Sequence, residues 1–274
     1  MKEEYRQDAE RILSHRKDQG WDLWTTSDHR ISKGSPFSLL GSLLLLAELG
    51  MDPSDPAIIT GTDLVFETLR PDGRFQVAPK GAMLPCQTIN ALNVLCHLGQ
   101  GEDPRLYSTW TYLLDTRHTD GGWRCLKFSY GRGPETEFSN PGPTLAALDA
   151  FRLNPKYDSD PRLDKAVGFL LDHWDTRLPL GPCHYGIGSL FLQVEYPFLT
   201  YNLFNYVYVL SHYPKARQDA RFLDALQCLS KKLSDGQIIV ERVNPKLKDF
   251  NFCRKGCPSE AGTRRYQEIL NSLK

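Results

Sequence analysis

PCQTINALNVLCHLGQGEDPRLYSTWTYLLDTRHTDGGW, residues 85–123, carries every boundary signal of one helix pair. Pro85 opens an apolar run with helical spacing, and proline costs nothing in a first turn because the N–H that it lacks would be unpaired there. Asp103 followed by Pro104 is typical of a second helix start, with the aspartate as N-cap. Asp120-Gly121 is a turn signal that ends this second helix. The stretch therefore predicts two consecutive helices joined by a short connection.

The same signals return in the same order along the chain, which indicates an internal repeat. The motif Pro-x-x-Thr stands at residues 85–88, 141–144 and 197–200, with the copies 56 residues apart, and a weaker copy stands at 36–39. Each copy precedes an apolar run, so the sequence predicts a helix start at each of them.

Two further signals mark the second helix of each pair. Aspartate at an N-cap position recurs at Asp55, Asp103, Asp160 and, in a degenerate form, Asp219. An Asp-Gly turn ends the second helix in three of the repeats, and the third repeat lacks it. These turns, each with the apolar residue three positions after its aspartate, are Asp72-Gly73 with Phe75, Asp120-Gly121 with Trp123, and Asp235-Gly236 with Ile238. We expect each apolar residue to fold back and pin its turn against the next pair.

The repeats predict four helix pairs and two unpaired terminal helices. The pairs span about residues 36–79, 85–123, 141–180 and 197–240, and the terminal helices lie near residues 2–17 and 260–273. A stack of such pairs forms either an open solenoid or a closed ring. We favour the ring, because the terminal helices can make a fifth pair and because the first helix of each pair is the more apolar one, as an inner layer requires. The expected fold class is all-α, a single α/α-toroid domain over residues 1–274.

The composition excludes several classes of protein. The formal net charge is zero, which gives no reason to expect general binding to nucleic acid or to an anionic membrane surface. The most apolar stretch, residues 39–49, is far shorter than the ~20 residues of a transmembrane helix, so no transmembrane segment is expected. The N-terminus lacks the apolar region of a signal peptide, and seven cysteines are an odd number for a disulfide framework. We therefore expect a cytoplasmic protein.

The turn Thr119-Asp-Gly-Gly-Trp123 resembles the Q-x-x-D-G-x-W turn of the prenyltransferase and squalene-type terpene cyclase superfamily, whose members are α/α toroids. The weaker Pro71-Asp-Gly-Arg-Phe75 and the Pro-Cys-x-Thr start at Pro85 add to the likeness. The resemblance implies the toroid fold over nearly the whole chain.

The chain also departs from the pattern of that superfamily. Leu69, Arg117 and Lys232 stand where the glutamine before each Asp-Gly would be, and motifs of the D-x-D-D and D-D-x-x-D types are absent from the sequence. The resemblance therefore implies a divergent member. Zinc-assisted transfer is the chemistry that it favours, and cyclisation by a protonating aspartate is disfavoured.

In a toroid the long connections, residues 124–140, 177–196 and 240–262, fall on one rim, where long loops are usually functional. Five cysteines map to this rim: Cys86, Cys125, Cys183, Cys253 and Cys257. Zinc prefers thiolate and imidazole ligands. The enrichment predicts a zinc site in which Cys125, Cys183 and His184 are the ligands and Cys86 is the next candidate. Gly-Trp-Arg-Cys125 and Cys183-His184 are also similar to elements of lanthionine cyclases, another zinc-bearing toroid family. The alternative is a set of unconnected loop cysteines.

The predicted catalytic residues are Cys125, His184 and Tyr130, because a zinc-bound thiol is deprotonated and nucleophilic. The same rim presents the N-termini of the inner helices, whose N–H groups and dipole favour an anion such as a diphosphate. The anion-binding residues predicted beside them are Lys80, Arg124, Lys127 and Arg132. The alternative is a solvated, charged rim.

Aromatic residues around the last inner helix predict an apolar pocket. Tyr201, Phe204 and Tyr208 have the i, i+3, i+7 spacing of one helix face. Phe198 lies with them around this helix, and Trp123 lies on an adjoining turn. These rings are candidates for lining an isoprenoid pocket or for steadying an allylic cation by cation–π contact. Aromatic core packing explains the same stripe.

The function predicted first is a zinc-assisted, prenyltransferase-like transferase, or a lyase or cyclase, that acts on an isoprenoid or another apolar small molecule with an anionic head. The second hypothesis is a non-catalytic toroid scaffold that binds a lipid or a peptide. The third is a carbohydrate-active α/α barrel, which needs two rim carboxylates about 5–10 Å apart. Its candidates, Glu135, Glu137 and Glu195, form no recognisable pair in the sequence. A partner subunit that supplies missing residues is left open.

Overall fold

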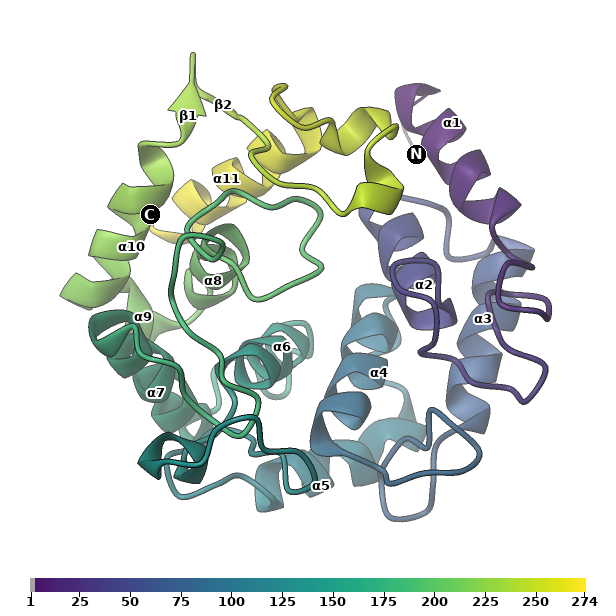
Figure 1. Ribbon diagram of the computed structural model, residues 1–274, viewed down its shortest axis with the longest axis horizontal. Coiled ribbons are helices and arrows are strands. Elements are labelled where there is room, and N and C mark those ends of the chain that lie inside the picture. The colour runs from purple at the N-terminus through teal and green to yellow at the C-terminus, as the bar shows by residue number, and fades with distance from the viewer. Residues whose placement is uncertain (1–2) are drawn as a thin grey trace. The chain divides into compact units, whose positions relative to one another are not determined.

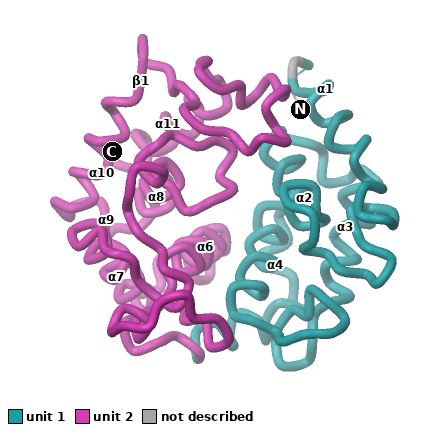
Figure 2. The backbone as a smooth tube through the Cα atoms, in the orientation of Figure 1, with its two compact units in different colours: residues 1–115 teal, residues 116–274 magenta. Residues whose placement is uncertain are grey.

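The computed structural model describes residues 3–274, and helices dominate them (Figure 1). The predicted all-α class is confirmed. Among the described residues, the sheet is a two-stranded hairpin of β1 (Leu233–Ser234) and β2 (Gln237–Ile238). The chain divides into two compact units, unit 1 (residues 1–115) and unit 2 (residues 116–274), which Figure 2 distinguishes by colour.

Unit 1 consists of two helix pairs and an N-terminal helix. Its elements are α1 (Glu3–Ser14), α2 (Leu39–Glu48), α3 (Pro56–Glu67), α4 (Pro85–His97), the short 3₁₀ turn η1 (Pro104–Leu106) and α5 (Tyr107–Asp115). Helix α2 packs against α1, α3 and α4, and α4 packs against α5. Leu39, Leu43 and Leu46 of α2 are fully buried, so the most apolar stretch of the sequence is a core helix.

Unit 2 contains the remaining helix pairs and the C-terminal helix. Its elements are η2 (Pro134–Glu137), α6 (Pro141–Phe151), η3 (Pro161–Leu163), α7 (Asp164–Thr176), α8 (Leu203–Leu210), α9 (Pro214–Arg217), α10 (Ala220–Ser230), η4 (Pro245–Leu247), η5 (Asn251–Cys253) and α11 (Glu260–Ser272). Helices α6 and α8 are buried along most of their length, whereas α7 and α10 pack against them and keep one face in solvent. This difference agrees with the expected inner and outer helices of each pair.

All four predicted aspartate N-caps are present. The carboxylates of Asp55, Asp103, Asp160 and Asp219 each accept a hydrogen bond from the backbone N–H two residues ahead, at distances of 2.8 to 2.9 Å. This bond satisfies one of the N–H groups that a helix start leaves unpaired. Local sequence therefore sets the starts of the second helices.

The three Asp-Gly turns are pinned by one repeated hydrogen bond. The backbone N–H groups of Phe75, Trp123 and Ile238 donate to threonine hydroxyls that lie within the first turns of following helices. The acceptors are Thr88 at 3.1 Å, Thr144 at 3.2 Å and Thr263 at 3.0 Å, respectively. The threonine of the Pro-x-x-Thr motif thus holds the preceding turn in the second and third pairs.

Glycine is required where these turns meet the next outer helix. Gly121 has φ +94°, and a Cβ on it would lie 2.7 Å from the backbone nitrogen of Ala166 in α7. Gly73 has φ +83°, and a Cβ there would lie 2.3 Å from the carbonyl oxygen of Ser108 in α5. A side chain at either position is therefore excluded both by conformation and by contact.

The predicted helix start at Pro197 is wrong. Helix α8 begins at Leu203, where the side chain of the N-cap residue Asn202 accepts a hydrogen bond from Asn205 N–H at 3.0 Å. The N–H of Leu203 is also taken by the carbonyl oxygen of Phe191, at 2.8 Å. These bonds hold residues 197–202 outside the helix, so the third Pro-x-x-Thr copy is not a helix start.

The terminal helices are found near their predicted places, as α1 and α11. Lys2, the predicted first residue of the N-terminal helix, lies outside the described residues. The fifth pair, the closure of the ring and the single domain stay predictions. Across residues 3–274, every helix is too short or too polar to cross a lipid bilayer.

Candidate functional site

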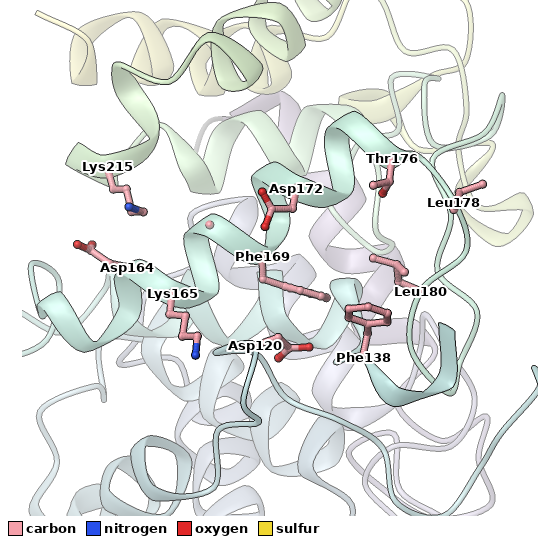
Figure 3. Close-up of a pocket in the computed structure, with 11 residues that line it drawn as sticks. Asp120, Phe138, Asp164, Lys165, Phe169, Asp172, Thr176, Leu178, Leu180 and Lys215 are labelled. Atoms are coloured by element: carbon pink, nitrogen blue, oxygen red, sulfur yellow. The ribbon is translucent and has the colours of Figure 1, made fainter. Parts of the chain in front are cut away.

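Unit 2 contains a groove of about 720 Å³ along the exposed face of α7 (Figure 3). Helix α7 supplies residues from Asp164 to Thr176, and the rest come from the segments on either side of it and from α9. The lining residues are Asp120, Phe138, Asp164, Lys165, Gly168, Phe169, Asp172, Thr176, Leu178, Leu180 and Lys215. A volume of this size is typical of small-molecule sites, which range from roughly 300 to 1,000 Å³.

Gly168 keeps the middle of the groove open. The α7 residues that line the groove recur at helical spacing, so they share one face of the helix. A Cβ on Gly168 would meet one neighbouring atom within 4 Å, the Cε of Lys215 at 3.8 Å. Neither the backbone conformation nor a close contact requires glycine at this position, and the missing side chain leaves the groove open.

One end of the groove carries three large apolar side chains, with Asp120 and Thr176 beside them. Phe138 and Leu178 are large side chains that remain 43% and 65% exposed, and Leu180 lies beside them (Figure 3). The buried ring of Phe169 forms the floor between this end and the middle of the groove. Exposed apolar side chains that converge on a groove mark a binding site for an apolar group.

The other end of the groove carries two lysines. Lys165 and Lys215 lie with Asp164 at the end opposite to Leu178 and Leu180 (Figure 3). Among residues 3–274, neither lysine forms an ion pair within 4.0 Å. The two ammonium groups are therefore available to an anionic group of a ligand.

Two of the three carboxylates in the lining are already engaged. Asp172 is paired with Arg221 of α10. Asp120 accepts hydrogen bonds from the N–H and hydroxyl of Ser139, at 2.7 and 2.6 Å, and from Gly122 N–H at 3.1 Å. Burial alone would raise the pKa of Asp120, but these hydrogen bonds outweigh it and hold the pKa below its ordinary value. Of the lining carboxylates, Asp164 is left near the two lysines, and Asp219, outside the lining, also attracts Lys215.

A buried histidine positions the apolar end of the groove. One ring nitrogen of His173, Nε2, lies 3.0 Å from the carbonyl oxygen of Leu178, and Nδ1 lies 2.9 Å from the hydroxyl of Tyr201. Burial lowers the pKa of His173 to about 4. The neutral ring therefore donates through Nε2 to the backbone of Leu178 and accepts from Tyr201 through Nδ1.

The predicted zinc ligands do not form a metal-binding group in this structure. Cys86 lies in the first turn of α4 in unit 1, whereas Cys125, Cys183 and His184 belong to unit 2. Cys125 is buried, but the exposed His184 ring lies 3.2 Å from a carboxylate oxygen of Glu135. Within residues 3–274, no three or more His, Cys, Asp or Glu side chains are grouped so that they could hold a metal ion. The zinc site therefore stays a prediction.

Of the predicted anion-binding residues and Tyr130, Lys80 belongs to unit 1 and the other four lie within residues 124–132 of unit 2. Lys80 is exposed in unit 1, and Arg124 donates to the carbonyl oxygen of Thr136 at 2.9 Å. Lys127, Tyr130 and Arg132 are exposed on one loop of unit 2.

Of the predicted pocket aromatics, Trp123, Phe204 and Tyr208 are buried, whereas Phe198 and Tyr201 are partly exposed. The ring of Phe198 contacts those of Phe204 and Tyr208, with ring centroids 4.9 and 5.2 Å apart, respectively. The spacing predicted that Tyr201 shares a helix face with Phe204 and Tyr208. It does not, because Tyr201 lies before the start of α8, where its ring stacks on His173. The fifth ring, Trp123, is buried and stacks on Phe151.

The three carboxylates that were candidates for a carbohydrate-active site each contact a different basic residue. Glu135 contacts His184, and Glu137 lies 3.4 Å from Arg124. Glu195 is buried against Arg242 and Thr200.

None of the predicted site residues lines the α7 groove, so sequence analysis missed this site. One signal was present. Gly168 stands in the middle of a helix, where glycine costs about 0.5–1 kcal/mol relative to alanine, and such a residue usually has a packing or functional reason.

No protein-family model matches the chain, and no curated protein matches it. Among solved structures, it is similar to a type II terpene cyclase from Scytonema in complex with its product, merosterolic acid A. The match has 15% sequence identity and a TM-score of 0.45, and it covers 86% of this chain and 66% of that chain.

Proposed function

We propose that this chain binds an amphipathic small molecule, an apolar chain with an anionic head, in the groove on α7. The observation that carries the proposal is the polarity along the groove. Phe138, Leu178 and Leu180 lie at one end, and Lys165 and Lys215 lie at the other. An apolar tail would be removed from water at the first end, while the ammonium groups would hold the head.

The ligand class is the one expected from the sequence, an isoprenoid or another apolar molecule with an anionic head. The proposal concerns binding and not a reaction. In the described part of the chain, the groove lining includes no cysteine or histidine that would act as a nucleophile or base.

The proposal is tested by calorimetric titration with three probes. Farnesyl diphosphate has both an apolar tail and an anionic head, farnesol has the tail alone, and inorganic diphosphate has the head alone. We expect farnesyl diphosphate to bind at least tenfold more tightly than either fragment, a difference of about 1.4 kcal/mol.

Substitution of Gly168 gives a matched pair of variants. Gly168→Phe fills the middle of the groove and is expected to weaken binding of farnesyl diphosphate at least about tenfold. Gly168→Ala adds one methyl group at ordinary contact distance from Lys215 and is expected to keep the affinity. Both substitutions favour the helix, so both proteins should remain folded. Equal affinities for the two variants would contradict the proposal.

The lysines are tested by a second pair of variants. Lys165→Gln combined with Lys215→Gln should weaken binding of farnesyl diphosphate about five- to tenfold and leave farnesol unaffected, because exposed charges contribute modestly. The control is Lys231→Gln, an exposed lysine at the end of α10 that is not part of the groove. An unchanged affinity for farnesyl diphosphate in the double variant would rule out a head-group role for these lysines.

A further inference from the structure

The loop of residues 124–134 in unit 2 exposes three large apolar side chains within five residues. Leu126 is 81% exposed, Phe128 45% and Tyr130 74%. They alternate with polar residues, and none of them lines the α7 groove. Burying such side chains in an apolar environment is favourable, so their exposure on a short loop indicates a surface that meets another phase or molecule.

The base of this loop is firmly attached to the rest of unit 2. Tyr130 N–H donates to the carbonyl oxygen of Pro182 at 2.7 Å, and Gly181 N–H donates to that of Glu135 at 2.9 Å. Gly131 is buried, and a Cβ on it would lie 2.3 Å from Nε2 of His184. These contacts involve the backbone of the loop, so its apolar side chains remain exposed.

The loop also carries an excess of positive charge, although the whole chain has a formal net charge of zero. Residues 124–134 include Arg124, Lys127 and Arg132 and no acidic residue. Arg124 is held at the base by Thr136 and Glu137. Lys127 and Arg132 are exposed and, within the described residues, form no ion pair.

We infer that residues 126–132 form a docking loop that places unit 2 on an anionic lipid surface. Phe128 and Tyr130 are the residue types that settle at the boundary between headgroups and acyl chains, and Leu126 would enter the acyl region. Lys127 and Arg132 would contact the anionic headgroups, with their aliphatic stems along the apolar side chains.

The combination of features favours a lipid surface over an acidic protein partner. A membrane needs protruding apolar side chains with cations beside them, and the loop has both within seven residues. The net charge argues against general attraction to membranes, so binding would be confined to this loop.

The inference is tested by sedimentation of the full chain with vesicles. One set consists of phosphatidylcholine, and in the other about a third of it is replaced by phosphatidylserine. We expect binding to the anionic vesicles, weakened by added salt, and little binding to the neutral ones. Equal binding to both sets, or none to either, would overturn the inference.

Two variants separate the apolar and the charged contributions. The triple variant Leu126→Ser, Phe128→Ser, Tyr130→Ser should abolish the binding. Lys127→Gln with Arg132→Gln should weaken it about 25-fold, since each cation near an anionic surface contributes about a factor of five. The matched control is Leu223→Ser, because Leu223 is an apolar side chain on α10 that is 47% exposed and lies outside the loop. Loss of binding in this control, or retention in the triple variant, would overturn the inference.

Insertion itself is measured with Phe128→Trp. The emission of this tryptophan should shift to the blue when anionic vesicles are added, whereas Leu223→Trp should not shift. An unchanged emission at position 128 would contradict insertion. If the chain bound an acidic peptide and not the vesicles, the partner would be a protein, and the inference would also be overturned. Gly168→Phe should bind vesicles like the unmodified chain, so failure of the groove proposal and failure of this one are distinguishable.

Discussion

Thr144 and Thr200 stand at the same position of the repeat, 56 residues apart, and have different roles. Thr144 accepts the backbone N–H of Trp123 and so holds the Asp120-Gly121 turn. No such turn precedes Thr200, whose hydroxyl donates to the buried carboxylate of Glu195. Arg242 donates to both Glu195 and Thr200, so the third repeat replaces a backbone contact with a polar side-chain cluster.

The comparison shows where the repeat leaves room for a site. After α5 the chain turns at once, and Gly121 packs directly on α7. After α7 the chain instead ends the helix on Arg177, in a left-handed conformation with φ 55°, and continues past Leu178 and Leu180. The groove lies on the helix whose closing turn is missing.

The largest loss of stability is expected from a substitution at Gly121. Gly121→Ala combines a positive φ with a contact to the α7 backbone, so it should lower the free energy of unfolding by about 4 kcal/mol or more. The control is Gly236→Ala, where φ is +75° but no atom lies within 4 Å, and about 1–2 kcal/mol is expected. Urea denaturation measures both. Equal losses would show that contact with α7 does not matter.

The next largest effect is a dependence of stability on pH, which comes from His173 in α7 of the third helix pair. The pKa of His173 is about 4 in the folded chain, below the ordinary value of 6.5. The unfolded chain therefore binds more protons than the folded one between pH 6.5 and pH 4, and stability is lost as pH falls through this window. The loss due to His173 is about 3 kcal/mol.

His173→Gln isolates this contribution. The variant should lose less stability than the unmodified chain when the pH is lowered from 7 to 4. His212, whose pKa is also lowered by burial, acts in the same direction and is common to both proteins. Parallel curves of unfolding free energy against pH for the two proteins would exclude a buried, neutral His173.

A smaller difference is expected between the two threonines. Thr144→Val leaves the buried N–H of Trp123 without an acceptor and should cost about 1–3 kcal/mol. Thr200→Val leaves Glu195 with Arg242 as partner, and Thr200 is exposed, so about 1 kcal/mol or less is expected. Thermal unfolding of the two variants gives the comparison directly, and a larger loss at Thr200 would reverse it.

The smallest change in stability is expected from variants of the predicted zinc ligands. Zinc-assisted transfer requires the side chains of Cys125, Cys183 and His184 to come together on metal binding. The hypothesis predicts stoichiometric zinc in the purified protein and its loss in Cys125→Ser. Because His184 is exposed, His184→Ala should change the unfolding free energy by less than about 1 kcal/mol in the absence of metal. Metal analysis that finds no stoichiometric zinc ends the hypothesis.

The helices were largely predictable because their boundaries are set locally. An aspartate N-cap acts on a backbone N–H two residues away, so Asp55 and Asp160 mark helix starts without reference to the rest of the fold. The start at Pro197 was mispredicted because a long-range bond, from Leu203 N–H to the Phe191 carbonyl, decides where α8 begins.

The groove was not predictable for the same reason. Phe138, Phe169 and Lys215 lie on three separate segments, and only packing brings them to one face. None of the cysteines and aromatic residues predicted as site residues lines the groove. The rings of Phe204 and Tyr208 are core residues, which the helical spacing alone does not distinguish from a pocket wall.

The open space above Gly168 has a consequence for ligand length. Position 168 points away from the core. Progressively larger side chains at this position would therefore shorten the longest ligand tail that fits in the groove. The interior of unit 2 would not need to be rebuilt for such a change. Chain-length preference would then be adjustable by exchanging one amino acid, independently of the interactions that keep the helices folded.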